Sequence, residues 1–384
     1  MLRWVHGLAI ATSVVLLAYF AARSWPTMAA VELLGPEPDT PEYIDGAVQL
    51  LRGQYGQARP PIYPPGFSLL LAPAVAIGGP SASGWVPFLA AVVLGIVSAV
   101  VAVRLSNPLA APLAVFFVLF ATAPRMLAQL VLTDLVVAAL VLSQAVTLAF
   151  ASGRAAAVLG GLLGGFLVWV RLASIPLAVA GLAGARGRRA AVWYVVGALP
   201  LLVLLPVWQW WVYGSPTTTG YLAVGAGPNG DGSMGSLFSL AYVLGPPVAA
   251  DGPVHGGAAR EWELPNLPFY ALELLGADSF LFRPGVGLIG LVAAVVYATR
   301  EPPLGAIARS ALACTVATVA IYLPYFYQSG RFLAAPAALL AVLAAVALAR
   351  LVETLLRRLA PDIVLPRSAA RRNRWCGTRG RATD

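Results

Sequence analysis

The sequence predicts an all-α polytopic membrane protein with about ten transmembrane helices and with interfacial helices in its first outer loop. Hydrophobic residues make up 59% of the 384 residues and charged residues only 11%, with a mean hydropathy of +0.81. The apolar residues gather in runs of about 17 to 25, the length that crosses the hydrocarbon core of a bilayer as a helix. The basic residues, all arginine, stand mainly at the ends of these runs. This scatter does not fit a nucleic-acid-binding surface, so we expect no nucleic-acid partner despite the net charge of +9.

Apolar runs divide the chain into spans and loops. A shorter apolar segment, 66–79, predicts a half-inserted or interfacial helix, and a second short apolar segment covers 266–276. We expect one transmembrane domain over residues 1–350, with a first outer loop at 36–67 and a second large outer loop at 214–265. Residues 351–384 are rich in arginine and predict a disordered cytoplasmic tail. The predicted spans cover residues 5–24, 83–104, 108–122, 133–151, 155–171, 172–185, 190–213, 283–299, 305–325 and 332–350.

Arginine placement predicts the orientation of these spans. With the N-terminus in the cytoplasm, most of the 25 basic residues fall inside and most of the 16 acidic residues fall outside, as the positive-inside rule requires. We therefore expect a multi-pass protein of the plasma (inner) membrane with both termini cytoplasmic. The loops 36–67 and 214–265 then face outward.

The first outer loop predicts a short amphipathic helix. Thr40 can cap a helix whose first position is Pro41, and apolar residues recur at helical spacing from Ile44 to Leu51. Asp39 stands just before this helix, where the positive end of the helix dipole favours the carboxylate form. A carboxylate held there suits a general base. Asp39 can equally be a capping or solvated loop acid.

Three further charged residues interrupt apolar sequence on the same predicted face. Asp134, at the start of the span over 133–151, is the only acid between residues 46 and 230. An acid at an apolar boundary is costly unless it caps a helix or has a functional role. Arg171 and Arg331 stand at outer span ends, where arginines pair with acids, bind anions or snorkel to the interface.

Several motifs follow one another in a fixed order along residues 1–350. The first loop has the spacing D-x-x-x-Y-x-x-x-A-x-x-L-x-x-G from Asp39 to Gly53. The other segments are Tyr63-Pro64-Pro65-Gly66-Phe67, Thr133-Asp134, a glycine-rich run ending at Arg171, Tyr213-Gly214-Ser215-Pro216 with Gly220-Tyr221, and Gln328-Ser329-Gly330-Arg331-Phe332. Together they resemble the GT-C superfamily, membrane glycosyltransferases of mannosyltransferase and arabinosyltransferase type that take a sugar from a polyprenyl-phosphate donor. The chain departs from the usual pattern at Thr40, where members often carry glutamate, and at Phe332, where tyrosine is usual.

The resemblance implies a GT-C-like fold in which Asp39 is the catalytic acid of the first loop. We expect an inverting transfer of a sugar from the lipid donor to a hydroxyl on a glycan, lipid or protein acceptor at the outer face. A divalent cation, Mg²⁺ or Mn²⁺, is the candidate cofactor. The expected site consists of Asp39 as catalytic base, Asp134, Glu42 and Tyr43 as acceptor or metal support, Arg331 and Arg171 as ligands of the donor phosphate, and Tyr63, Pro64, Pro65 and Gln328 at the cavity and its turn.

Two other classes of protein would use the same features. A transporter or flippase for a lipid or lipid-linked sugar would bind an anionic headgroup with the same outer arginines. A catalytically inactive scaffold would share the fold. Against transport, the spans show no internal repeat and few charges at mid-depth.

Overall fold

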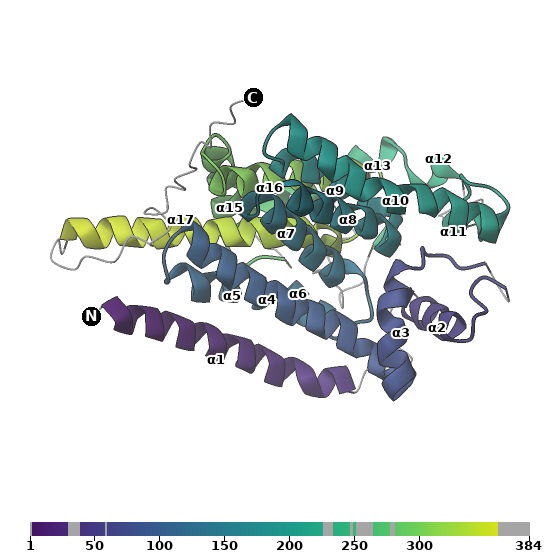
Figure 1. The fold of residues 1–384 in the computed structure, drawn as a ribbon, viewed down its shortest axis with the longest axis horizontal. Coiled ribbons are helices and arrows are strands. Elements are labelled where there is room, and N and C mark those ends of the chain that lie inside the picture. The colour runs from purple at the N-terminus through teal and green to yellow at the C-terminus, as the bar shows by residue number, and fades with distance from the viewer. Residues whose placement is uncertain are drawn as a thin grey trace, which may run out of the picture.

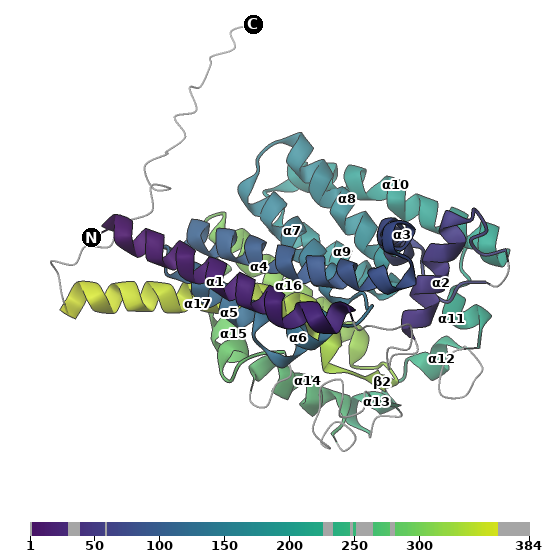
Figure 2. The same cartoon turned by 90° about the horizontal axis from the view of Figure 1, so that it is seen from below.

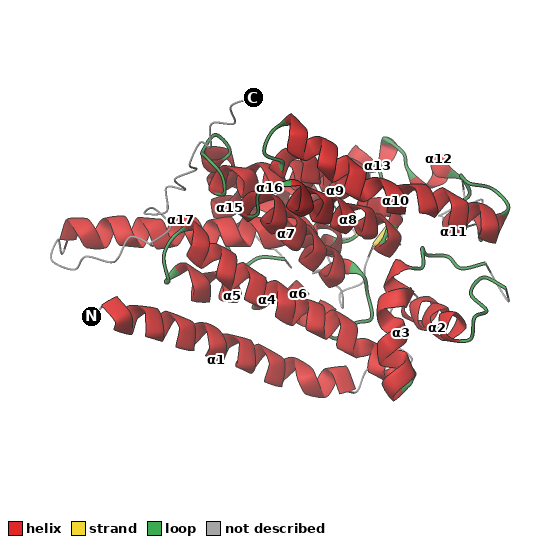
Figure 3. Cartoon of the chain, in the orientation of Figure 1, coloured by secondary structure: helices red, strands yellow, loops and turns green. Residues whose placement is uncertain are grey.

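Long helices running side by side make up most of the molecule, because backbone groups in lipid must find hydrogen-bond partners within the segment that crosses it. The computed structural model describes residues 2–29, 39–57, 60–225, 233–245, 249–250, 264–276 and 281–359. Short helices and loops gather at one end of the bundle, at the right of Figures 1 and 3, and the start of α1 lies at the other end. Figure 2 shows the same arrangement from below.

The described chain consists of helices and one small pair of strands. Its first half contains α1 (Leu2–Ala29), α2 (Asp39–Leu51), α3 (Gly66–Gly78), η1 (Pro80–Gly84), α4 (Trp85–Leu105), α5 (Ala110–Leu119), α6 (Thr122–Leu127), α7 (Asp134–Phe150), α8 (Arg154–Val170), η2 (Leu172–Ser174), α9 (Ile175–Ala180) and η3 (Gly181–Gly184). Its second half contains α10 (Arg188–Tyr213), α11 (Gly220–Ala223), α12 (Met234–Leu237), α13 (Ala241–Leu244), β1 (Ala249–Ala250), α14 (Asn266–Leu275), α15 (Val286–Tyr297), α16 (Leu304–Tyr322), β2 (Tyr327–Gln328), η4 (Gly330–Leu333) and α17 (Ala334–Leu359).

Five helical stretches of the described chain are long and apolar enough to cross a membrane, and shorter apolar helices accompany them. The protein is therefore a multi-pass membrane protein, while the number of about ten spans stays a prediction. The five stretches are Trp4–Trp25, Pro80–Leu105, Arg188–Tyr213, Leu304–Tyr322 and Gly330–Leu359.

The segment predicted as a span at 172–185 is broken into η2, α9 and η3. Two of its glycines lie against neighbouring helices. A Cβ on Gly181 would stand 2.4 Å from Gln144 Nε2, and one on Gly184 would stand 2.6 Å from Ser310 Oγ. These two glycines pack the segment closely against α7 and α16.

Helix α17 forms the centre of the bundle. It packs against α4, α5, α7, α15 and α16, and most of its first two-thirds is buried alanine, leucine and valine. Small side chains let helices approach closely where hydrophobic burial cannot drive association in lipid. Arg331 lies in η4, immediately before this helix. The stretch Gly330–Leu359 is the most buried of the five long apolar stretches of the described chain, and it fixes the position of that arginine.

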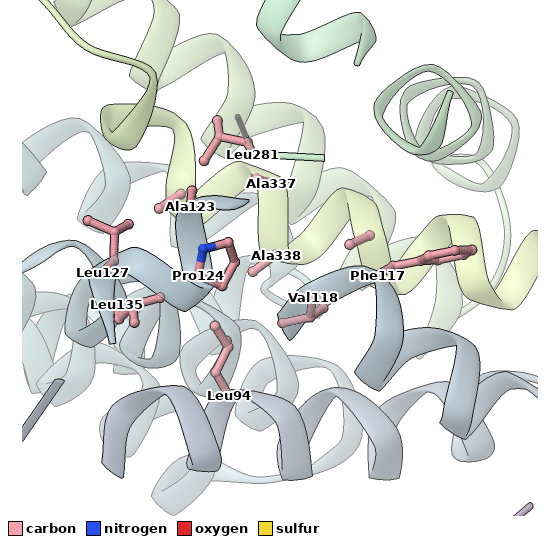
Figure 4. Close-up of a pocket in the computed structure, with 12 residues that line it drawn as sticks. Leu94, Phe117, Val118, Ala123, Pro124, Leu127, Leu135, Leu281, Ala337 and Ala338 are labelled. Carbon is pink, nitrogen blue, oxygen red and sulfur yellow. The ribbon is translucent and has the colours of Figure 1, made fainter. Parts of the chain in front are cut away.

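A small apolar gap lies between α4, α5, α6, α7 and α17 (Figure 4). Its volume is about 20 Å³, and residues such as Leu94, Phe117 and Ala338 line it. All its lining residues are apolar, so a water molecule there would find no side-chain partner. We interpret this gap as a packing void among the helices.

Both predicted helices of the first outer loop are present. The helix expected from Pro41 is α2, and the half-inserted segment 66–79 is α3, with Pro73 inside it. At the other end of the chain, α17 continues through Leu359 into the segment predicted as the tail. Residues 360–384 and Glu37 of the first loop lie outside the described residues.

Helices α8 and α10 pack closely together, and Arg171 follows the last residue of α8. A Cβ on Gly161 of α8 would stand 1.9 Å from the Tyr194 carbonyl oxygen, and a Cβ on Gly197 of α10 would stand 2.1 Å from the Val158 carbonyl oxygen. Each helix therefore approaches the backbone of the other through a glycine.

Gly161→Ala is expected to destabilise the protein by about 1–3 kcal/mol, the usual effect of overpacking. The measurement is thermal unfolding of purified protein in detergent. Gly7→Ala is the matched control, because it is also a helical glycine but has nothing within 4 Å of its Cβ position. An equal melting temperature for Gly161→Ala and Gly7→Ala would contradict the close packing.

Candidate active site

Helix α2 places Asp39 and Tyr43 one turn apart, and the turn before α3 brings Tyr63 to both. The Tyr63 hydroxyl donates a hydrogen bond to Asp39 Oδ1 at 2.6 Å. The Tyr63 and Tyr43 rings stack with their centroids 4.5 Å apart. Ser68 of α3 donates to the Tyr43 carbonyl oxygen at 3.0 Å, so α3 holds α2 in register with the turn.

Thr40 does not act as the helix cap that the sequence predicts. Helix α2 already includes Asp39, and Thr40 Oγ1 donates to the Val131 carbonyl oxygen at 3.4 Å. The buried hydroxyl therefore ties α2 to the segment before α7. This contact places the start of α2 beside the start of α7, where Asp134 lies.

Gly66 of the proline turn sits against the end of α8. A Cβ at this position would stand 2.4 Å from the carbonyl carbon of Trp169, so any larger residue would push the first loop away. Pro64 and Pro65 are buried beside it, and Pro65 immediately precedes α3. The turn thereby brings the first loop to the point where α8 ends and Arg171 begins.

Asp134 and Arg171 form a buried ion pair. Arg171 Nη1 donates to Asp134 Oδ1 at 2.6 Å, and the Asp134 side chain is only 3% exposed. Asp134 is the first residue of α7, whose N-cap is Thr133. The two side chains lie 37 residues apart in sequence, and each fixes the position of the other.

A second ion pair links the first loop to the start of α17. Arg331 Nη2 lies 3.8 Å from Asp39 Oδ2, with the Arg331 side chain 7% exposed and the Asp39 side chain 26% exposed. This distance is longer than a hydrogen bond, so the contact is one of charge. Asp39 is the most exposed of the four ion-paired side chains at this end of the molecule.

Phe332 connects the two ion pairs. The guanidinium carbon of Arg171 lies 4.8 Å from the centre of its ring, and that of Arg331 lies 5.6 Å from it. Tyr322 stacks on the same ring at 4.1 Å. Cations within about 6 Å of an aromatic face are attracted to it, so this ring stabilises both guanidinium groups.

Tyr43 lies among all four charged groups. Burial raises the pKa of its hydroxyl well above the usual value. The carboxylates of Asp39 and Asp134 raise this pKa further, and the charges of Arg171 and Arg331 oppose them. The residues that the sequence singled out separately therefore meet around one tyrosine side chain.

Tyr63 is held in its neutral form. Burial raises the pKa of its hydroxyl first, the neighbouring Tyr221 and Tyr43 rings add to the effect, and Asp39 adds more. A neutral phenol keeps its proton and remains a donor. Tyr63 therefore orients Asp39 through a donated hydrogen bond and does not compete for a proton.

The end of α10 and the described start of the second outer loop pack onto the first outer loop. Tyr213 donates a hydrogen bond to the Pro61 carbonyl oxygen at 2.5 Å. A Cβ on Gly220 would stand 2.2 Å from the Ile62 carbonyl oxygen. This close approach brings Tyr221 edge-on to Tyr63 at 5.6 Å, so the two loops form one wall of the site.

A cavity of about 240 Å³ opens beside Arg171. Its walls come from the segment after α8, from the end of α16 and from the second loop, and they are mostly apolar and aromatic. Arg171 is the charged residue among its lining residues. The other residues at its walls are Leu172, Ala173, Ile175, Thr219, Tyr221, Leu237, Phe238, Ile321, Tyr322 and Tyr325.

Asn266 is a residue of this region that the sequence did not indicate. It begins α14, and its amide nitrogen donates to the carbonyl oxygens of Leu323 and Tyr325 at 2.9 and 2.8 Å. Gln328 is fully buried and donates to Asn266 Oδ1 at 3.0 Å. Together they hold the segment that leads from α16 to Arg331. A single asparagine at the start of an apolar segment offers no sequence signal for this role.

The remaining predicted residues lie around this centre. Glu42 is half-buried in the first turn of α2. Gln328 lies behind the site in the Asn266 contact rather than at the cavity wall. No group of three or more His, Cys, Asp or Glu in the described chain could hold a metal ion. Asp134 Oδ1 bonds Arg171, and the role of Asp134 as a metal ligand and the divalent cation itself stay predictions.

Comparisons with known proteins address the fold. No family model and no curated protein sequence matches the chain. Two solved structures of ArnT from Cupriavidus metallidurans, a GT-C glycosyltransferase, match it, one bound to undecaprenyl phosphate and one in the apo state. The chain has a GT-C-like fold.

The structural match covers most of this chain, whereas the sequence identity is low. With the undecaprenyl phosphate complex of ArnT the TM-score is 0.57 at 16% identity, covering 88% of this chain and 60% of that one. With apo ArnT the TM-score is 0.58 at 15% identity, covering 95% of this chain and 68% of that one. The chain thus spans about two thirds of the length of ArnT or less.

The Asp134–Arg171 pair yields a prediction on stability. Asp134→Asn leaves Arg171, whose side chain is 21% exposed, without its counter-charge and should destabilise the protein by about 1–3 kcal/mol. Adding Arg171→Gln should recover part of this loss, because both charges are then gone. A double-mutant cycle on thermal unfolding in detergent measures the coupling. Strictly additive effects would show that the two side chains do not interact.

Proposed function

We propose that the protein is an inverting glycosyltransferase that moves a sugar from a polyprenyl-phosphate donor to an acceptor hydroxyl. The observation that carries the proposal is the contact between Asp39 and Arg331. It sets a partly exposed carboxylate 3.8 Å from a buried guanidinium, at the end of the bundle where the polar loops gather. Sugar transfer from a lipid phosphate needs a base for the acceptor and a cation for the leaving phosphate, and these two groups supply them.

Asp39 acts as the base in this proposal. As the acceptor oxygen bonds to the anomeric carbon, its proton passes to Asp39, and the bond from that carbon to the phosphate oxygen breaks on the opposite side. The polyprenyl phosphate leaves with the electron pair. A positioned base of this kind contributes about 10² to 10⁴ in rate. Tyr63 orients the carboxylate from Oδ1, which favours Oδ2 as the atom that takes the proton.

Arg331 stabilises the charge that develops on the leaving phosphate. A buried guanidinium aimed at developing charge acts more strongly than one in water, and its planar fork suits phosphate oxygens. Arg171 has a supporting role, because its Nη1 already bonds Asp134. Asp134 in turn keeps that arginine at the wall of the cavity. This role differs from the sequence prediction, in which Asp134 orients the acceptor or holds a divalent cation.

The cavity beside Arg171 is the candidate for the donor. Its apolar and aromatic walls suit the first isoprene units and the sugar face, and its one charged wall suits the phosphate. ArnT, which shares the fold, has been solved with undecaprenyl phosphate bound. We propose that the site faces outward from the plasma (inner) membrane, with both termini in the cytoplasm, as the arginine distribution predicts.

Asp39→Asn is expected to lower sugar transfer by about 10² to 10⁴. The measurement is mass spectrometry of cell-envelope glycans, lipids and glycoproteins from cells that carry the wild type, a variant or no protein. Asp45→Asn is the matched control, because Asp45 lies exposed on the same helix and bonds Gln49. Asp39→Asn should be inactive and Asp45→Asn active, at equal amounts in the membrane.

Near-normal transfer by Asp39→Asn would show that Asp39 is not the base. The transporter alternative has a separate outcome. Vesicles that hold the purified protein would move a labelled lipid-linked sugar from one leaflet to the other without forming product. Movement without product would replace the transferase proposal.

A further inference from the structure

A second cavity lies at the opposite end of helix α8 from the candidate active site. Its volume is about 500 Å³, which falls in the range of about 300 to 1,000 Å³ typical of ligand sites. Arg154, the first residue of α8, lines it, whereas Arg171 follows the last residue of that helix. A 17-residue helix separates its ends by about 25 Å, so this cavity is distinct from the site around Asp39.

Three arginines line this cavity without a compensating acid. They are Arg154, Arg186 and Arg189. Arg154 lies over the Trp193 ring at 5.1 Å, and Arg186 donates to the Ala149 carbonyl oxygen. Within the described residues none of the three forms an ion pair, and residues 135–230 contain no Asp or Glu. A concave surface with charge of one sign concentrates counter-ions.

Two helix starts border the same cavity and add to its positive potential. Helix α8 follows Gly153 and helix α10 follows Gly187, and no side chain caps either start. Neither helix carries an acid in its first turn. The positive end of each helix dipole therefore remains uncompensated by the chain.

Ordinary snorkelling does not explain this arrangement. An arginine that only marks a span end reaches separately into water. The side chains of Arg154, Arg186 and Arg189 are exposed, as is that of Arg104 at the end of α4, so their shared position and not their exposure sets them apart. Arg154 begins α8, Arg186 lies just before α10 and Arg189 lies in the first turn of α10, and all three line one concave site. Leu148, Ala157 and Trp193 add apolar walls to it. Cationic groups beside apolar walls suit an amphiphile with an anionic head.

We propose that this cavity binds a phosphate-bearing anion, with the headgroup of an anionic membrane lipid as the favoured source. Basic pockets between transmembrane helices on the cytoplasmic side are known to hold such headgroups, and the arginine distribution predicts that this end faces the cytoplasm. The site is independent of the proposed transferase reaction. A soluble phosphate or diphosphate shares the recognised chemistry and is the other source.

The test measures lipid retention by native mass spectrometry of the full-length protein from detergent. The probes are phosphatidylglycerol, phosphatidylcholine as the zwitterionic control, and inorganic pyrophosphate. The wild type should retain phosphatidylglycerol over phosphatidylcholine. The triple variant Arg154→Gln, Arg186→Gln, Arg189→Gln should lose about tenfold or more of this retention. The matched triple Arg104→Gln, Arg188→Gln, Arg300→Gln removes the same charge outside the cavity and should behave as the wild type.

The outcomes separate the sources. In one outcome, the wild type binds pyrophosphate while the triple variant of the cavity arginines does not, with lipid retention equal in both. That result would support an anion site whose ligand is a soluble phosphate compound. Equal retention of both lipids, with no pyrophosphate binding, overturns the proposal, as does equal loss in both triple variants. If the cavity triple does not fold, Arg189→Gln is compared with its neighbour Arg188→Gln. Only Arg189 lines the cavity, so an equal response of these two variants likewise overturns the proposal.

Discussion

The ion pair between Arg171 and Asp134 is the constraint on which the arrangement of the site depends. Removing both charges from water is costly, and only a short, well-aligned contact offsets that cost. The pair fixes the end of α8 against the start of α7. The Phe332 ring contacts the Arg171 guanidinium. Because Phe332 lies just before α17, this contact also fixes the position of the start of α17. Arg331 is the neighbouring residue, so a structural ion pair positions the arginine that faces Asp39.

Glycines and small residues let the polar loops reach this pair. Gly66 brings the first loop against the Trp169 backbone, and Gly220 brings the second loop against the Ile62 carbonyl. In a membrane protein the helices gain little from hydrophobic burial between them, so close backbone approach and polar contacts decide how they pack. The tyrosines that fill the remaining space keep Asp39 in place while leaving it the most exposed of the four charges.

Much of this could be predicted from the sequence, because its signals are local. Helices α2 and α3 follow from helical spacing, Gly53 and the proline turn, and Asp134 and Arg171 stand out because charges are rare in apolar runs. Local sequence does not show which distant residue each polar side chain contacts. Asn266 bonds carbonyl oxygens almost 60 residues away, and Thr40 finds Val131 rather than its own helix.

The central claim is that Asp39 and Arg331 meet at a site for a polyprenyl phosphate. An experimental structure of the protein with undecaprenyl phosphate, by crystallography or by electron microscopy with a bound antibody fragment, tests it most directly. We expect the phosphate within hydrogen-bond distance of the Arg331 guanidinium, with the first isoprene units in the cavity beside Arg171. A phosphate bound away from Arg331, or lipid density confined to the opposite end of the bundle, would contradict it.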